Sequence, residues 1–427
     1  MKRKKMIKKL AEVPKWLLLA LYYKRYARAS RGLISYETLE VLGPEHEFCL
    51  VDSELKPLPI VEEVINEYYT KLASFLYLPN SAFRKEFPSQ IVELKARKPF
   101  KSPELLEETM QKAILSFLDF LKKKYDAQLL GTGMHPLLGL EETSVREHDI
   151  IAQELGKVFP LKRHGWLNIQ SFQINLPYSS EQEAVTLYNM LAQLCTYLPA
   201  ISAASPICEG QLTPYDDFRL VSYKSKSVEF PSVTGDVIPE YISSFSQFEK
   251  EVSDVYSRDL TNAGVSVGDF EEYVNQRGLV FKFKRNALEV RVIDEQECIR
   301  SDVALSCFVR SAIRGLTASD NDVLPHQVLV NDYNSIVKDG LGAETLNPLG
   351  KDAKHICQYF LNLAYKYADE NEKRYLWIIQ KRINEGNLSK LIRKRVQNRA
   401  QKTTLKEAII SIYSKLAECV SKNQPYF

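Results

Sequence analysis

The chain has 427 residues, 45% of them hydrophobic and 26% charged, a composition typical of a folded globular protein that argues against a disordered or fibrous one. The net charge is only +3, but residues 1–32 hold eleven Lys or Arg against a single acid, so the remainder is mildly acidic. Seven scattered cysteines without a CxxC pair favour reduced thiols and a cytoplasmic protein over a disulfide framework.

The basic start, residues 1–36, is predicted to be a helical extension. Its apolar run, Trp16–Tyr23, is too short to cross a bilayer, and more basic residues follow it than normally follow the apolar core of a secretion signal. An amphipathic helix on a membrane surface is one interpretation. We favour a basic helix that packs on its own domain or on a partner.

Hydrophobic spacing predicts the elements up to residue 178. The expected elements are strand 37–52, helix 59–77, strand 88–96, helix 102–124, strand and loop 127–139, and strand 166–178.

Capping and turn signals predict the elements after residue 178. Ser180 and Glu183 form a capping box that opens a helix, and Thr404 with Glu407 forms another near the end. Residues 211–250 are expected to be a polar binding loop, and 278–294 two strands. Asp302 is expected to cap the next helix. The pattern is helical from 351 onward.

This order of elements, with helices between strands in no regular alternation, predicts an α+β fold with an antiparallel sheet flanked by helices. We divide the chain into the extension 1–36, a catalytic domain 37–330 and a helical C-terminal region 331–427.

Four predicted strands place polar groups on one face and apolar groups on the other, because side chains alternate along a strand. One solvated sheet face would give the same alternation. The abundance of glutamate points to a site instead, since clustered carboxylates repel one another unless a cation such as Mg²⁺ compensates them. The polar members are Glu45, Glu47, Glu93, Gln173, Asn175, Glu289 and Arg291.

Six segments in consistent order, between about residues 40 and 300, resemble the glutamate–cysteine ligase family in its carboxylate–amine ligase branch. No Walker A loop or GxGxxG motif is present, so a P-loop or Rossmann site lacks its motif. The segments are "LGPEHEF", "KEFPSQIVELKARKP", "GTGMHP", "SFQINLPYSSEQEA", "PAISAASPICEGQLTPYDDFR" and "LEVRVID".

The resemblance implies a glutamine-synthetase-like catalytic domain, with the sheet curved into a funnel that holds ATP and Mg²⁺. It implies that ATP phosphorylates a glutamate carboxylate and that an amine, usually cysteine, then forms the amide. The residues carried over are Glu45, Glu47, Glu93 and Glu289 as metal ligands, Arg291 and Glu289 as catalytic residues, and Arg219, Gln173, Asn175 and His135 as substrate-binding residues.

Some features depart from the family pattern or fall outside it. Pro44 and His46 are unusual in the opening motif, and Lys95, Arg97 and Lys98 form a basic trio beside the glutamate strand. The basic start and residues 351–427 lie outside the resemblance.

Two further hypotheses remain open. The same chemistry can serve a different amine or peptide acceptor. Alternatively, the chain is an inactive ligase scaffold that binds a membrane surface or nucleic acid through its basic ends, since residues 373–402 hold ten Lys or Arg beside Tyr375 and Trp377. The sequence does not assign the oligomeric state.

Overall fold

The computed structural model describes residues 36–72, 80–146, 149–265, 274–319 and 323–427. Except for its last residue, the predicted basic extension 1–36 lies outside the described residues. The structure therefore has no bearing on that prediction.

A seven-stranded antiparallel sheet forms the centre of the molecule, which confirms the predicted fold class. The strand order is β2-β3-β1-β5-β9-β8, and β4 pairs with the end of β1. The strands are β1 Gly43–Val51, β2 Ser81–Lys85, β3 Ile91–Ala96, β4 Gln128–Leu130, β5 Ser171–Pro177, β8 Leu279–Lys282 and β9 Ala287–Asp294. Strand β2 is not among the predicted elements. A separate short pair joins β6, Ile207–Cys208, to β7, Gln211–Leu212.

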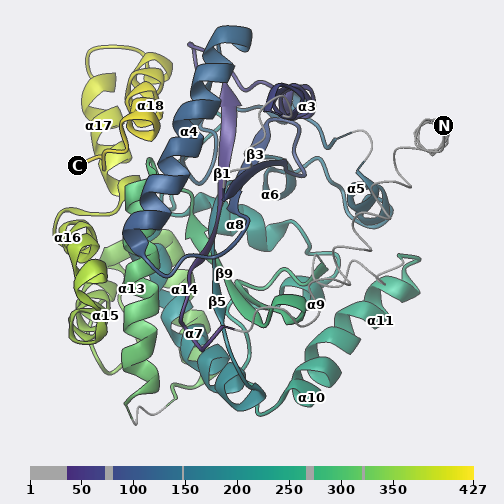
Figure 1. Cartoon of the computed structure of the whole chain (residues 1–427), viewed down its shortest axis with the longest axis vertical. Helices are drawn as coiled ribbons and strands as arrows, with labels where there is room; N and C mark the ends of the chain where they lie inside the picture. Colours follow the sequence, from purple (N-terminus) through teal and green to yellow (C-terminus); the bar gives the residue numbers. More distant parts are fainter. Residues whose placement is uncertain (1–35, 73–79, 147–148, 266–273, 320–322) are drawn as a thin grey trace, which may run out of the picture.

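Helices lie on both sides of this sheet, with α13, α15 and α16 to its left in Figure 1 and α5, α10 and α11 to its right. The helices before residue 265 are α3 Val61–Leu72, α4 Pro103–Tyr125, α5 Ile150–Leu155, α6 His164–Leu167, α7 Glu181–Ser202, α8 Phe218–Ser225, α9 Pro231–Thr234, α10 Phe245–Phe248 and α11 Asp254–Asn262. The later ones are α13 Ile299–Thr317, α14 His326–Asp339, α15 Ala353–Tyr367, α16 Glu370–Glu385, α17 Leu388–Ala400 and α18 Leu405–Lys422.

The apolar side chains of the strands form the main core, as the alternation predicts. Phe48, Phe172, Ile174, Val290 and Val292 are all fully buried in one cluster with residues of α7 and α13. The opposite face of the same strands carries the polar side chains. The period-two pattern thus fixes which face of the sheet can hold a site.

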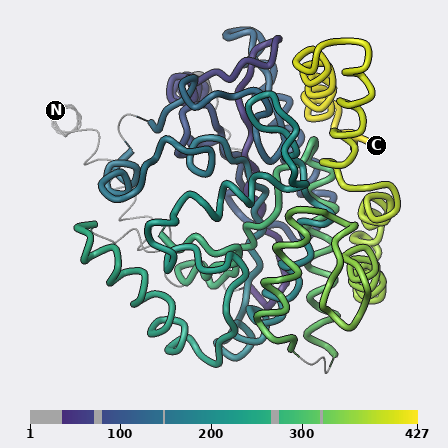
Figure 2. Tube along the Cα trace, turned by 180° about the vertical axis from the view of Figure 1, so that it is seen from behind, coloured from purple at the N-terminus to yellow at the C-terminus, as the bar shows by residue number. Residues whose placement is uncertain are grey.

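The last two helices close a second core at one end of the sheet. Cys49 and Leu130 pack there in one buried cluster with Ile392, Ile409 and Tyr413. Figure 2 shows this C-terminal part, in yellow, running along one side of the molecule.

The structure differs from two expectations drawn from local sequence and confirms a third. Segment 211–250 is not simply a loop, because α8, α9 and α10 lie within it. Asp302 does not cap α13. The helix begins three residues earlier, with Cys298 at its N-cap, and Asp302 lies buried in its first turn. The two capping boxes are correctly predicted as N-caps, since Ser180 and Thr404 accept hydrogen bonds from the helix backbone.

All seven cysteines are free and buried, which agrees with the predicted reduced thiols. Among the described residues, no helix combines the length and apolar character needed to cross a bilayer.

Candidate functional site

The strand register brings the predicted polar residues onto one continuous surface across β3, β1, β5 and β9. Glu47 lies opposite Glu93, and Glu45 lies opposite both Lys95 and Gln173. Asn175 then lies opposite Glu289. We call this surface the carboxylate face. Its glutamates are largely withdrawn from water, with exposed fractions of 8% for Glu47 and 1% for Glu289.

Two glutamates of the carboxylate face already have cationic partners. Lys95 Nζ lies 2.9 Å from Glu45, and Arg285 lies 3.1 Å from its other oxygen. Glu289 is paired with Arg291 at 2.7 Å and with Lys282 at 3.2 Å. Burial alone would raise the pKa of each carboxyl group, but these cations lower both pKa values.

Three other carboxylates lack enough positive charge, namely Glu47 and Glu93 of this face and Glu86, which follows β2. Burial raises the pKa of Glu47 to about 7, and burial together with the charge of Glu47 raises the pKa of Glu86 to about 7. The pKa of Glu93 also rises because of burial, although Lys95 lies 3.0 Å away and opposes the rise. Lys95 compensates one charge of the Glu45–Glu93 pair, so the second carboxyl group tends to keep its proton.

Neutral side chains orient the glutamates. Gln173 donates to Glu47 Oε1 at 3.1 Å, and the backbone N–H of Ser171 donates to Glu47 Oε2 at 2.6 Å. Asn175 donates to Glu45 Oε1 at 3.2 Å. Gln173 and Asn175 thus belong to the carboxylate face, and their present partners are the glutamates.

The carboxylate face fits Mg²⁺ by its donor chemistry. Glu47 and Glu93 are buried and Glu86 is partly buried, and together they supply hard oxygen ligands with too little compensating positive charge, which is the setting that favours a small divalent cation. Glu45 and Glu289 can join such a site only by exchanging part of their contact with Lys95, Arg285, Lys282 and Arg291.

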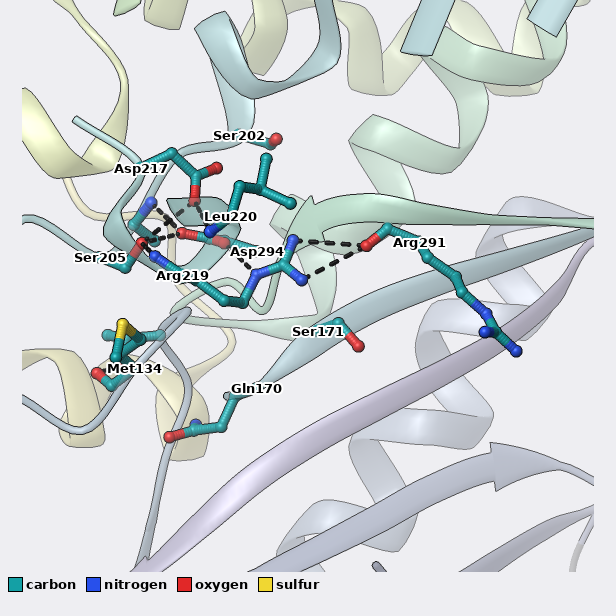
Figure 3. A network of polar contacts seen from close by, with 12 residues as sticks. Met134, Gln170, Ser171, Ser202, Ser205, Asp217, Arg219, Leu220, Arg291 and Asp294 are labelled. Carbon is teal, nitrogen blue, oxygen red and sulfur yellow. Dashed lines mark hydrogen bonds and ion pairs between the residues drawn. The ribbon is translucent and has the colours of Figure 1, made fainter. Parts of the chain in front are cut away.

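Arg219 is close to the predicted site but is already paired within the protein. Its guanidinium is fully buried and pairs with Asp294, and it also donates to the backbone oxygen of Arg291 at 3.4 Å (Figure 3). Asp294 in turn accepts from Ala204 N and Ser205 Oγ at 2.7 and 2.8 Å. Arg219 therefore links α8 to β9, and its guanidinium is occupied by contacts within the protein.

The GTGMHP turn packs against the same aspartate, which explains one of its glycines. A Cβ at Gly133 would lie 2.2 Å from Asp294 Oδ2. His135 is fully buried in this turn, where its Nε2 lies 2.7 Å from Leu55 O and its Nδ1 accepts from Leu137 N. Burial lowers the His135 pKa to about 4. Both ring nitrogens have backbone partners, so we leave His135 out of the proposed substrate-binding set.

His46 lies on the opposite face of β1 from the glutamates and helps to hold the strand in place. It stacks on Phe172 and its Nδ1 lies 3.2 Å from Asp302. Glu295 lies beside this pair and accepts a hydrogen bond from the backbone N–H of Glu47 at 2.9 Å. Burial raises the pKa of both Glu295 and Asp302. The cluster therefore anchors the strand that carries Glu45 and Glu47.

His46, Glu295 and Asp302 also offer three potential ligand atoms within 4.8 Å of one another. We interpret them as a hydrogen-bonded clamp rather than a metal site. His46 Nε2 has no hydrogen-bond partner among the described residues. Histidines that bind metals normally donate from their second nitrogen.

Sequence reasoning did not place Glu86, Lys95 or Lys226 in the site. Glu86 lies in the segment "KEFPSQIVELKARKP", which resembles the family, but sequence reasoning assigned a metal-binding role only to Glu93 in that segment. Lys95 was noticed only as part of a basic trio, although its register opposite Glu45 follows from strand pairing. Lys226 follows a helix and gave no sequence signal.

Comparisons with known proteins find a family model and relatives that cover much of the chain. Residues 41–413 match the model of the family described as glutamate-cysteine ligase family 2. The match extends past residue 300, so our sequence resemblance ended too early and wrongly left out most of the C-terminal helices.

Individual relatives cover much of the chain. An uncharacterised protein of Archaeoglobus fulgidus is 39% identical over 391 residues, which is 90% of this chain and 100% of that protein. A Rubrobacter xylanophilus protein named "Putative glutamate--cysteine ligase 2-1" is 25% identical over 278 residues, 64% of this chain and 67% of its own. The glutamate–cysteine ligase of Francisella tularensis, solved with AMP, has a similar fold, with a TM-score of 0.57 at 12% identity, covering 91% of this chain and 90% of that one.

Proposed function

The chain belongs to glutamate-cysteine ligase family 2, and from this premise we propose that it is an ATP-dependent carboxylate–amine ligase that uses the carboxylate face of its sheet. In this proposal ATP phosphorylates the side-chain carboxylate of glutamate, and an amine then displaces the phosphate to form an amide. Cysteine is the amine that we propose first, since the family is described by that reaction.

One observation carries the proposal more than any other. Glu47 and Glu93 lie opposite each other on one face of the sheet, and the pKa values of both, like that of Glu86 just after β2, are raised because burial outweighs the nearby cations. Such an arrangement destabilises the ligand-free protein and becomes favourable when a divalent cation enters. If this face served only as a solvated surface, the carboxylates of Glu47 and Glu93 would be expected to stay exposed to water.

The chain's own residues would bind and orient the reactants. Glu47, Glu86 and Glu93 would hold Mg²⁺, which when bound supplies positive charge against the phosphates of ATP. Gln173 would keep the side-chain carboxylate of Glu47 oriented, and Asn175 would do the same for Glu45. Arg291, 12% exposed at its side chain, would present its guanidinium to the transferred phosphoryl group while Glu289 holds it.

The atoms balance in two steps. An oxygen of the substrate carboxylate attacks the terminal phosphorus of ATP, which gives an acyl phosphate and ADP. The amine nitrogen attacks the acyl carbon, the phosphate departs, and a proton leaves the nitrogen. Holding both reactants in place supplies much of the rate enhancement in such a reaction.

A ligase that uses another amine or a peptide is the second candidate. The residues of the carboxylate face act on the phosphoryl group and the carboxylate, so they do not select the amine. The helices α8, α9 and α10 within segment 211–250 are where we expect that selection.

Binding of nucleic acid or membrane through the basic C-terminal helices is less well supported. Arg382 is buried and paired with Glu297, while Arg393 donates to the backbone oxygens of Thr213 and Tyr215. Arg395 lies over the ring of Tyr426. These side chains serve the fold, which leaves fewer cations for an external anion.

The proposal is tested by ADP release from purified protein given ATP, Mg²⁺, glutamate and a panel of amines that includes cysteine. We expect release to require both glutamate and an amine, and to fall at least a hundredfold in Glu93→Gln. Glu108→Gln, on the surface of α4, is the matched control and should behave as wild type. ADP release that ignores glutamate and every amine would refute the proposal.

A further inference from the structure

Lys226 differs from the other cations near the carboxylate face because it lacks a carboxylate partner. Lys95 and Arg285 are paired with Glu45, Lys282 and Arg291 with Glu289, and Arg219 with Asp294. Within the described ranges, no carboxylate oxygen lies within 4.0 Å of Lys226 Nζ. The residue is nevertheless only 3% exposed.

The surroundings of Lys226 are aromatic and closely packed. Its Nζ lies 3.9 Å from the centre of the Tyr223 ring and 4.6 Å from the centre of the Trp166 ring. Trp166 also donates to the backbone oxygen of Lys226 at 3.1 Å. Gly165 permits this approach of α6 to α8, because a Cβ there would lie 2.1 Å from Ser222 O. The ammonium group is held in a defined position.

Two rings do not replace a counter-ion. A cation–π contact stabilises an ammonium group by less than the free energy that is lost when the group is withdrawn from water. Burial accordingly lowers the pKa of Lys226 well below its ordinary value. The nearby hydroxyl of Tyr223 is buried as well, and it forms no well-aligned hydrogen bond among the described residues.

Lys226 lies at the end of α8, the helix whose Arg219 donates to the backbone oxygen of Arg291 in β9. The charges of Arg291 and Glu47 both act on it, and Arg291 acts on Tyr223 too. Arg219, which the family resemblance assigned to substrate binding, is already paired with Asp294. Arg291 is proposed to face the transferred phosphoryl group, so the other anionic groups of the substrates need a further cation.

We propose that Lys226, held against the ring of Tyr223, binds an anionic oxygen group of a substrate, either a carboxylate of the amino acid or a phosphate of ATP. The inference rests on the proposed ligase function and adds a substrate-binding residue to it. The bound oxyanion supplies the negative charge that no carboxylate supplies to Lys226 in the ligand-free protein. Binding therefore removes the free-energy cost of an unpaired buried ammonium group.

The experiment compares Lys226→Met and Lys226→Arg with wild type by isothermal titration of ATP with Mg²⁺ and, separately, of glutamate. Lys226→Met is expected to weaken the binding of one of these ligands at least tenfold, and which one identifies the anion. Its melting temperature without ligand should equal or exceed that of wild type, because a desolvated charge is lost. Lys226→Arg should keep more of the affinity.

The control is Lys224→Met, two residues earlier and within α8, where the lysine is 41% exposed and 3.8 Å from Asp236. It should bind both ligands as wild type does. A purely structural role for Lys226 predicts the reverse pattern, a lower melting temperature with unchanged affinity. That result, or equal affinity of Lys226→Met and wild type for both ligands, would overturn this inference alone.

A measurement on the wild-type protein covers the case in which Lys226→Met does not fold. In protein labelled with ¹³C and ¹⁵N at its lysine side chains, the NMR signal of Lys226, identified by its absence from Lys226→Arg, should shift when the bound ligand is present. An unchanged Lys226 signal under saturating ATP with Mg²⁺ and saturating glutamate would overturn the inference. Wild-type protein that binds neither ligand would overturn the ligase proposal and this inference together.

Discussion

At the scale of single residues, the two glutamates of the opening motif have opposite electrostatic situations. Glu45 has Lys95 and Arg285 beside it, whereas Glu47 has only hydrogen-bond donors in direct contact. Two residues that share one strand face and one motif therefore make contributions of opposite sign to stability. Only the partners, which come from distant segments, distinguish them.

We expect Glu47→Gln to stabilise the ligand-free protein by about 1–3 kcal/mol at pH 8, because it removes a buried, uncompensated charge. It should also abolish the rise in melting temperature that Mg²⁺ gives to wild type. Glu45→Gln is the matched control and should lower the free energy of unfolding, since it leaves Lys95 and Arg285 with less compensation. Chemical denaturation measures both, and changes of the same sign in the two variants would contradict the electrostatic assignment.

The pH dependence of stability follows from the same groups. Glu47 and Glu86 have pKa values raised from 4.5 to about 7, so the folded state binds more protons than the unfolded state between these limits. The free energy of unfolding should therefore fall as pH rises from 4.5 to 7, by about 3 kcal/mol for a buried group such as Glu47. Saturating Mg²⁺ should reduce this fall. A metal-free protein whose stability rises across the interval would contradict the account.

At the scale of elements, β1 is the best-anchored strand of the site. It pairs with β3, β4 and β5, and the clamp of His46, Glu295 and Asp302 holds it from behind. The face to which each strand directs its polar residues was predictable, because side chains alternate between the two faces of a strand. The clamp was not, because it joins residues about 250 positions apart.

The helices are fastened by a buried ion cluster that is separate from the site. Glu372 at the start of α16 is fully buried between Arg310 and Arg314 of α13. Glu372→Ala should cost about 3–5 kcal/mol, because it leaves Arg310 buried without its partner. Lys373→Ala, which breaks an exposed pair with Glu370, should change stability by less than about 0.5 kcal/mol.

Denaturant midpoints test this prediction, and ligand titration at low temperature is the second readout. Glu372→Ala should still bind ATP with Mg²⁺ when folded. A variant that is as stable as wild type would show that the ion cluster contributes nothing. A stable variant that no longer binds would instead place Glu372 within the functional site.

At the scale of the whole molecule, the C-terminal helices complete the sheet rather than follow it. Ile392, Ile409 and Tyr413 of α17 and α18 bury Cys49 of β1 and Leu130 of β4. The family match extends to residue 413 as well. A boundary at residue 331 therefore describes a change from mixed to helical structure, and we propose that it does not separate two folding units.

Truncation after Glu385 should consequently prevent cooperative folding, because the second core at the end of β1 and β4 becomes exposed. Circular dichroism during thermal unfolding, compared with the full chain, measures the effect. A truncated protein with an unchanged melting temperature and unchanged Mg²⁺ binding would show that the helical region is an independent unit.

Much of the fold and part of the site could be predicted from sequence. Alternation and helical spacing located most strands and helices, and motif order led to Glu45, Glu47, Glu93 and Glu289. Charge compensation escaped prediction, since it depends on Lys95 by strand register, Arg285 at a turn and Lys226 after a helix. The burial of Arg219 and His135 escaped for the same reason, because each meets partners from remote segments.

The most direct test of the account follows oxygen from the substrate to the phosphate. Purified protein is given ATP, Mg²⁺, an amine that supports turnover and glutamate labelled with ¹⁸O in its side-chain carboxylate. The account predicts one ¹⁸O atom in each phosphate released, because that oxygen bridges the acyl phosphate and leaves with phosphorus. Unlabelled phosphate, or no phosphate with any amine, would contradict the claim that this sheet face activates a carboxylate.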